Sequence, residues 1–136
     1  MSLDPAQTTH QADEEERKLL PAMLRGFANT CPACGNSALI TSGLKVIDQC
    51  PSCNEPLYHH RADDLPAYLN IFIIGHVVVA AAMITMDLEI FNMWTIVVGA
   101  CVLALAMALV LMRPLKGMVV GLQWALRMHG FGGHDD

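Results

Sequence analysis

Two long apolar runs constrain the fold of this chain more than any other feature of its sequence. Residues 67–86 hold one histidine and no charged side chain, and residues 93–112 hold neither. At about 1.5 Å of rise per residue, a helix over either run is about 30 Å long, which matches the hydrocarbon thickness of a bilayer. Residues 87–92 connect the runs and are too few to cross back. The sequence therefore predicts an antiparallel hairpin of two transmembrane helices, over residues 65–86 and 93–112.

The basic residues predict how this hairpin is oriented. All eight lysines and arginines lie before residue 62 or after residue 112, and the connecting loop has none. Loops rich in lysine and arginine stay on the cytoplasmic side of a membrane. The first 20 residues also lack the apolar core of a secretory signal peptide. We therefore expect a multi-pass membrane protein with both termini in the cytoplasm and residues 87–92 on the opposite side.

Four cysteines, Cys31, Cys34, Cys50 and Cys53, form two Cys-x-x-Cys pairs at the spacing of a four-thiolate zinc ribbon. Residues 29–62 are too few to bury a sufficient apolar core, and a bound metal ion supplies the missing free energy of folding. Cytoplasmic thiols stay reduced, which favours metal over two disulfides. A redox-active pair is the other alternative, but no strand–helix pattern surrounds either pair. We expect a structural Zn²⁺ with a closed coordination shell, although four thiolates also bind iron.

The remaining segments flank these two features. Residues 1–16 are expected to form an acidic, disordered N-terminus, and residues 131–136 an acidic tail. Residues 17–28 and 114–130 mix apolar and basic side chains, which is typical of helices that lie at a membrane surface. The second of these segments follows the Arg113-Pro114 pair and is placed on the cytoplasmic side.

Together these segments predict a mainly α-helical membrane protein. Its parts are a two-helix transmembrane hairpin, a small N-terminal zinc ribbon with a short β-hairpin over residues 38–47, and a C-terminal interfacial amphipathic helix. In that last helix Lys116, Gln123 and Arg127 share one face. The chain has a net charge of −5 and no basic stripe, so we expect no nucleic-acid partner.

His76 lies near the middle of the first apolar run. Ionisable residues are rare inside membranes and are often functional there. A haem or copper ligand, a member of a proton relay and a simple hydrogen-bonding residue all remain open for it. His129 lies beyond the second run, so no second axial ligand for a haem is evident.

Two carboxylates meet two histidines where the ribbon joins the first run. Asp64 is expected to cap the helix that begins near Leu65. With Asp63, His59 and His60 it alternatively forms a second metal or proton site. No arrangement of catalytic side chains is found, so the chain is not expected to be an enzyme.

Small side chains recur in the second run. Cys101 stands alone there and is expected to be a small buried hydrophobe. Alanines at every fourth position form a ridge that faces either the first helix or a partner protein. These alanines are Ala100, Ala104 and Ala108.

Nine short motifs follow one another along the chain. They are Cys31-Pro-x-Cys-Gly, Leu44-Lys-Val, Cys50-Pro-x-Cys, Arg61-Ala-Asp-Asp, Pro66-Ala-Tyr, Gly75-His-Val-Val-Val, Arg113-Pro-Leu-Lys-Gly, Gly121-Leu-Gln-Trp and Met128-His-Gly-Phe. In this order they resemble the bacterial family called domain of unknown function 983, over about residues 23–131. The resemblance implies a small inner-membrane protein with a cytoplasmic zinc ribbon and a periplasmic loop. Asn54 stands where the family usually has glycine, and asparagine tolerates the same left-handed backbone.

The resemblance also implies a role beside an aerobic respiratory oxidase, because alphaproteobacterial genes of this family often neighbour those for cytochrome c oxidase. We therefore expect an accessory subunit or assembly factor that docks on oxidase subunits within the lipid bilayer. The alternatives are a membrane protein that handles haem, copper or protons through His76, and an adaptor that recruits cytosolic partners through its ribbon. Beyond the cysteines, the candidate functional or interface residues are Arg61, Asp63, Asp64, His76, Arg113, Lys116, Gln123, Trp124 and His129.

Overall fold

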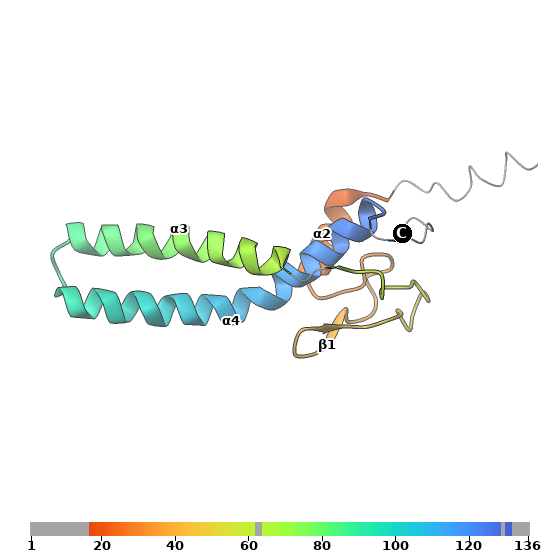
Figure 1. Cartoon of the computed structure of the whole chain (residues 1–136), viewed down its shortest axis with the longest axis horizontal. Coiled ribbons are helices and arrows are strands. Elements are labelled where there is room, and N and C mark those ends of the chain that lie inside the picture. The colour runs from red at the N-terminus through yellow and green to blue at the C-terminus, as the bar shows by residue number, and fades with distance from the viewer. Residues whose placement is uncertain (1–16, 62–63, 129, 132–136) are drawn as a thin grey trace, which may run out of the picture.

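A computed structural model describes residues 17–61, 64–128 and 130–131 of the 136-residue chain. Its elements are α2 (Leu19–Phe27), β1 (Ile40–Ser42), β2 (Lys45–Val46), α3 (Leu65–Asp87) and α4 (Met93–Ala125). Figure 1 shows α3 and α4 side by side as a long hairpin, with a small lobe at one end. The lobe comprises residues 17–61 and the part of α4 that follows Pro114. The predicted disordered N-terminus and nearly all of the acidic tail lie outside the described residues.

The two long helices carry their apolar side chains on the outside. Both α3 and α4 are long and apolar enough to cross a membrane by length and composition. Only 6% of the most apolar stretch of α3 is buried, and 0% of that of α4. The core helix of a soluble protein buries such a stretch, whereas these helices expose an apolar surface that the described residues do not cover.

Side chains cap only one of these two helices. Asn92 caps α4, because its Oδ1 accepts hydrogen bonds from the backbone N–H of Thr95 at 2.9 Å and from its hydroxyl at 2.7 Å. Asp64 stands at the N-cap position of α3, but its carboxylate makes no capping hydrogen bond. The predicted cap is therefore wrong. The backbone of Asp64 is helical, with φ −98° and ψ −31°, rather than extended as a capping residue requires.

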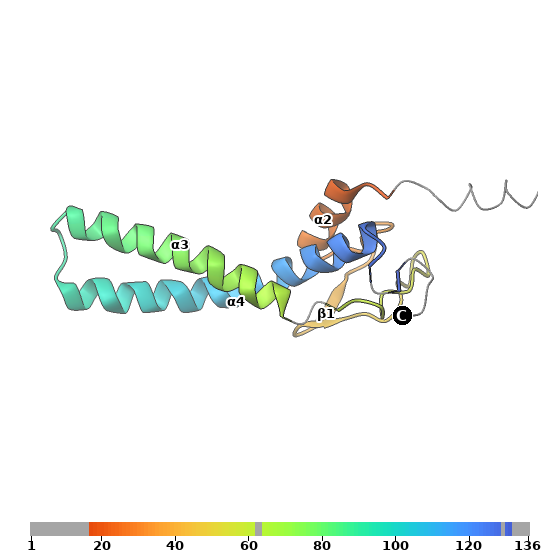
Figure 2. The same ribbon diagram turned by 45° about the horizontal axis from the view of Figure 1, so that its top comes forward.

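The helix α4 is continuous over 33 residues and includes Pro114. The predicted division into a helix over 93–112 and a separate interfacial helix over 114–130 is therefore wrong. Proline removes one backbone hydrogen bond, here to the carbonyl of residue 110, and bends a helix without always ending it. Figures 1 and 2 show that α4 bends part-way along its length. Beyond the bend α4 is held by the lobe, and its buried residues there include Leu115, Val119 and Gln123.

Small residues let α2 pack closely against this part of α4. A Cβ atom added to Gly26 or to Gly117 would overlap the backbone of the other, and one added to Gly121 would overlap the carbonyl group of Ala22. Both helices thus present small residues four positions apart, which allows their backbones to approach. Figures 1 and 2 show α2 lying against the end of α4.

The alanine ridge of α4 faces α3. The side-chain amide of the buried Asn70 in α3 donates a hydrogen bond to the carbonyl oxygen of Ala108 at 3.1 Å. Ala100 lines a hollow of about 280 Å³ between the two helices, and Ala81 of α3 lines the same hollow. Cys101 is exposed, so the prediction of a buried thiol is wrong. One residue along a helix rotates the side chain by about 100°, which turns Cys101 away from the ridge.

The core of the lobe joins the ribbon to α4. Strands β1 and β2 pair antiparallel, with Ile40 opposite Val46. Both side chains are buried against residues from α4, so the ribbon and the second half of α4 share one core. The buried members of this core are Cys31, Leu39, Ile40, Val46, Cys50, Leu57, Val119, Val120 and Phe131.

Candidate metal centre

Each Cys-x-x-Cys pair forms the same tight turn. The N–H of Gly35 donates to the carbonyl oxygen of Cys31 at 2.8 Å, and the N–H of Asn54 donates to that of Cys50 at 2.9 Å. Gly35 has φ +71° and Asn54 has φ +59°. The left-handed backbone predicted for Asn54 is thereby confirmed, and asparagine tolerates it better than most residues.

Further hydrogen bonds fix the two turns relative to each other. The N–H of Cys31 donates to the carbonyl oxygen of Ser37 at 2.8 Å, and the N–H of Cys50 donates to that of Glu55 at 3.0 Å. The hydroxyl groups of Ser37 and Ser52 lie 2.6 Å apart and join the two turns directly. Each pair of thiols is therefore aimed at a common point by its own backbone.

The four sulfur atoms converge on one site. All four Sγ atoms lie within 4.8 Å of one another. Cys31 Sγ lies 3.8 Å from Cys53 Sγ, and Cys34 Sγ lies 3.6 Å from Cys50 Sγ. A tetrahedral Zn²⁺ with bonds of about 2.3 Å separates its sulfur ligands by about 3.8 Å. The four cysteines are free thiols in geometry that suits a single metal ion.

The surroundings of the thiols favour one thiolate before metal binds. Burial opposes ionisation of Cys50, but hydrogen bonds from the N–H groups of Cys53 and Ser52 and from the Ser37 hydroxyl outweigh it and lower its pKa to about 6. Burial raises the pKa of Cys31 and, together with neighbouring thiols, raises that of Cys53 to about 12. A divalent cation stabilises the thiolate form of all its sulfur ligands, so the donor set fits a metal better than it fits four neutral thiols.

Arg25 places a positive charge beside the first turn. Its Nη1 donates hydrogen bonds to the carbonyl oxygens of Pro32 at 3.2 Å and Ala33 at 3.0 Å. A divalent ion with four thiolates carries a net charge of −2, which a nearby guanidinium partly balances. The sequence places Arg25 in the basic flank and in the interfacial segment over residues 17–28, and does not predict its contact with the first turn. The sequence feature that could have predicted this contact is a basic residue in the last helical turn before the first cysteine pair.

Three side chains bind the second turn to the end of α4. The indole Nε1 of Trp124 donates to Glu55 Oε1 at 2.8 Å. The Arg17 guanidinium lies 4.5 Å from the centre of the Trp124 ring, and its Nη2 lies 3.6 Å from the same carboxylate oxygen. Burial lowers the pKa of Arg17, and the charge of Glu55 counteracts that effect. Trp124 therefore has a structural contact for its polar atom.

Two further candidate residues also make contacts within the chain. The buried Gln123 accepts from the N–H of Arg61 at 2.9 Å and donates to its carbonyl oxygen at 3.0 Å. Arg113 Nε donates to the carbonyl oxygen of Gly43 at 2.8 Å. Gln123 thus does not lie on an open polar face, as the predicted interfacial helix required, and Lys116, two turns earlier in α4, is half-buried. These contacts fasten the turn between β1 and β2 and the C-terminal end of the ribbon to α4.

The structure does not assemble a second metal site from His59, His60 and Asp64. His60 Nδ1 lies 2.7 Å from the carbonyl oxygen of Leu57, and the His59 ring packs against Tyr58 and Phe131. Over residues 17–61, 64–128 and 130–131, the four cysteines are the one close group of three or more potential ligands. The remaining candidates, Asp63 and His129, lie outside the described residues.

His76 lies on the outer face of α3. Its Nδ1 is 2.8 Å from the carbonyl oxygen of Phe72, one helical turn earlier. A carbonyl oxygen only accepts, so in the neutral imidazole Nδ1 carries the proton and Nε2 is left as an acceptor. Asp64 precedes His76 by twelve residues, about 18 Å along the helix. The Asp64 carboxylate is therefore too far from His76 to share a metal ion or a proton with it.

A comparison with protein families identifies the family of this chain. Residues 40–124 match the model of the family described as Protein of unknown function (DUF983). The chain belongs to this family. The matched region contains Cys50, Cys53, α3 and all but the last residue of α4, whereas Cys31 and Cys34 precede it. The comparisons with curated proteins and with solved structures found no match.

Proposed function

We propose that this protein is a membrane-anchored zinc-ribbon adaptor that serves an aerobic respiratory terminal oxidase as an accessory subunit or assembly factor. The observation that carries the proposal is the shared core of the four-cysteine lobe and the hairpin. Val119 and Val120 of α4 are buried against the ribbon, so an ion that folds the ribbon also fixes its position on the two apolar helices. Such a unit presents a rigid surface at a defined height above a bilayer.

Aromatic residues at both ends of the hairpin support a membrane-spanning position. Tyr68 near the start of α3 is 69% exposed, and Trp94 at the start of α4 is 80% exposed. These side chains lie at opposite ends of the hairpin, and the helical rise separates them by about 27 Å along its long axis. Tyrosine and tryptophan prefer the two interfaces of a bilayer, and the separation matches its hydrocarbon thickness.

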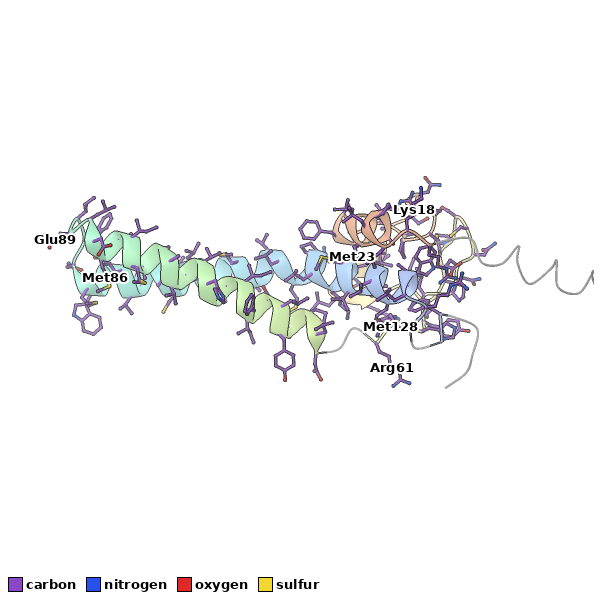
Figure 3. The ribbon with its side chains drawn as sticks, turned by 90° about the horizontal axis from the view of Figure 1, so that it is seen from above. Lys18, Met23, Arg61, Met86, Glu89 and Met128 are labelled. Carbon is purple, nitrogen blue, oxygen red and sulfur yellow. The ribbon has the colours of Figure 1, made fainter. Side chains whose placement is uncertain are left out.

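The charges of the two ends support a cytoplasmic lobe. Figure 3 shows Lys18 and Arg61 at the lobe end of the molecule and Glu89 at the opposite end. Because basic residues favour the cytoplasmic side, the proposed orientation puts the lobe in the cytoplasm and residues 87–92 in the periplasm. The thiols then lie in a reducing compartment, as a zinc site of this kind requires.

The exposed side of α2 supports a position at the membrane surface. Leu20, Leu24 and Phe27 are 65%, 60% and 46% exposed, and they point away from the Gly26 side that packs on α4. Gly26 meets Gly117, which lies about 7 Å beyond Met112 along α4. That height corresponds to the headgroup layer, where an amphipathic helix buries its apolar side.

The chemistry of the proposed metal site supports docking rather than catalysis. Four protein thiolates complete the coordination of Zn²⁺ and leave no position for water or substrate. When bound, the ion supplies folding free energy to a lobe that is otherwise too small to hold its shape. The family resemblance contributes the class of partner, because genes of this family often neighbour those for cytochrome c oxidase.

Purification of the tagged full chain in mild detergent tests the proposal. We expect subunits of a haem–copper oxidase to copurify, and we expect a Cys34→Ser variant, with its lobe disrupted and its hairpin intact, to recover far less of them. A Cys101→Ser variant is the matched control and should recover the wild-type amount. Recovery of the chain alone, together with normal oxidase levels in a deletion strain, contradicts the proposal.

A further inference from the structure

The outer face of α3 contains a glycine, Gly75, that no close neighbour among the described residues requires. A Cβ atom added to Gly75 would meet nothing within 4 Å. By contrast, a Cβ atom on Gly26 or Gly117 would collide with the backbone of a neighbouring helix. Glycine in the middle of a helix lowers its stability relative to alanine. At Gly75 no contact of the described residues compensates for that loss, so the space beside it is open to another backbone.

The next residue leaves a hydrogen-bond acceptor without a partner. His76 donates its Nδ1 proton to the Phe72 carbonyl oxygen, and its ring centre lies 4.3 Å from that of Phe72. Within the described part of the chain, Nε2 has no hydrogen-bond partner, and the side chain is exposed. In hydrocarbon no water is present to donate to such a nitrogen, so satisfying it stabilises an assembly.

We propose that this face of α3 binds a transmembrane helix of another protein, which donates an N–H or O–H hydrogen bond to His76 Nε2. The inference rests on the proposed membrane position of α3. The face forms a shallow groove of about 480 Å³, in which Gly75 allows close approach and apolar side chains surround the imidazole. The surrounding residues are Ile71, Phe72, Val79, Ala80 and Met83.

Hydrogen-bond complementarity favours a different protein over a second copy of this chain. Two copies related by a two-fold axis along the membrane normal would bring the Nε2 acceptors to the same depth, acceptor against acceptor. The side-chain amide of Asn70 and the hydroxyls of Tyr68 and Thr85 lie about 9, 12 and 14 Å away along α3, so none of them is at the depth of Nε2. Asn70 and Thr85 also already donate within the chain, to the carbonyl oxygens of Ala108 and Ala81.

The groove also favours a helix over a haem. It is lined by residues of α3 alone, so no second wall encloses a flat macrocycle. His76 is the one histidine between residues 64 and 128, so neither long helix offers a second imidazole ligand. The partner therefore carries serine, threonine, asparagine, glutamine, tyrosine or tryptophan at the depth of His76.

Photo-crosslinking of the full chain in cell membranes tests the inference. A photoreactive residue replaces Val79 on this face, or Val102 on α4 as a control. The two valines are 59% and 63% exposed, and each lies about 12 to 14 Å from the loop end of its helix. We expect an adduct from position 79 whose yield falls about tenfold with His76→Leu or Gly75→Leu and persists with His76→Gln, whose amide oxygen still accepts. Position 102 should give no such adduct.

Sequencing of the cross-linked fragment completes the test. The expected fragment is a transmembrane helix with a donor side chain at the depth of His76. The inference is overturned if position 79 gives no adduct, or if the yield is unchanged with His76→Leu. It is also overturned if the adduct is with a second copy of this chain or with a fragment that has only aliphatic side chains at that depth. A Soret band on the pure protein that disappears with His76→Leu would overturn it as well. Membrane fractionation and metal analysis of the same cells report separately on the proposed function. If the chain is membrane-bound and contains metal but gives no adduct, this inference is refuted and the proposed function is not.

Discussion

At the scale of single residues, Cys34 and Cys101 are thiols of one chain in different surroundings. Cys34 Sγ lies 3.6 Å from Cys50 Sγ, whereas Cys101 is exposed on α4. We expect Cys34→Ser to lose about one metal ion per chain and to unfold the ribbon, because metal binding contributes folding free energy. Cys101→Ser should change neither. Elemental analysis and limited proteolysis measure the two effects, and equal metal content in both variants would refute the assignment.

The pKa values of the ribbon thiols predict how metal binding depends on pH. Burial, with neighbouring thiols in the case of Cys53, raises the pKa values of Cys31 and Cys53, so both are protonated at neutral pH, whereas Cys50 is largely a thiolate there. Metal requires thiolates, so its binding displaces those protons. We therefore expect the affinity for Zn²⁺ to rise with pH across the neutral range. Calorimetry in buffers of different ionisation enthalpy measures the released protons, and a pH-independent affinity would contradict this account.

Gln123 offers a third test at this scale. Its buried amide makes both hydrogen bonds to the backbone of Arg61, one as acceptor and one as donor. Removing it in Gln123→Ala leaves two backbone groups without partners, which should lower the free energy of unfolding of the lobe by about 1–3 kcal/mol. Hydrogen exchange at the Arg61 amide should accelerate accordingly. Lys116→Ala is the control, because Lys116 makes no side-chain hydrogen bond or ion pair with the described residues of the ribbon. Exchange at the Arg61 amide should stay at the wild-type rate in this variant.

At the scale of elements, the crossing of α2 and α4 depends on missing side chains. Gly117 of α4 meets the backbone of Gly26, so Gly117→Val should push α2 away and destabilise the lobe by about 1–3 kcal/mol. Amide exchange throughout α2 should then approach that of an unprotected segment. Gly75→Ala is the matched control, since open space surrounds it and the lobe lies elsewhere. Unchanged protection of α2 in Gly117→Val would show that the close crossing is unimportant.

At the scale of the whole molecule, the proposed orientation predicts which surfaces face which compartment. In a chain with Cys101→Ser, a cysteine placed at Glu89 should react with a membrane-impermeant maleimide on intact cells. A cysteine placed at Arg61 should react only after the membrane is opened, because the proposed orientation puts the basic lobe end in the cytoplasm. Labelling of position 61 on intact cells would reverse the proposed topology.

The amino-acid sequence alone determined the features that depend on local patterns. Two apolar runs without charge specify long helices whatever surrounds them, and two Cys-x-x-Cys turns aim their sulfurs through hydrogen bonds only a few residues long. The left-handed backbone at Asn54 is local in the same sense. Membership of the family also follows from the sequence, since residues 40–124 match the family model.

Only the tertiary structure decided what these parts do to one another. Gln123 and Arg61 are 62 residues apart, Trp124 and Glu55 are 69, and Arg113 and Gly43 are 70. No local sequence pattern predicts such pairs, so the sequence alone indicated that these side chains were available to bind a partner protein. The same contacts keep α4 helical beyond Pro114, where the sequence predicted a break. A proline weakens a helix by a roughly fixed amount, and whether the helix ends there depends on packing by residues distant in the chain.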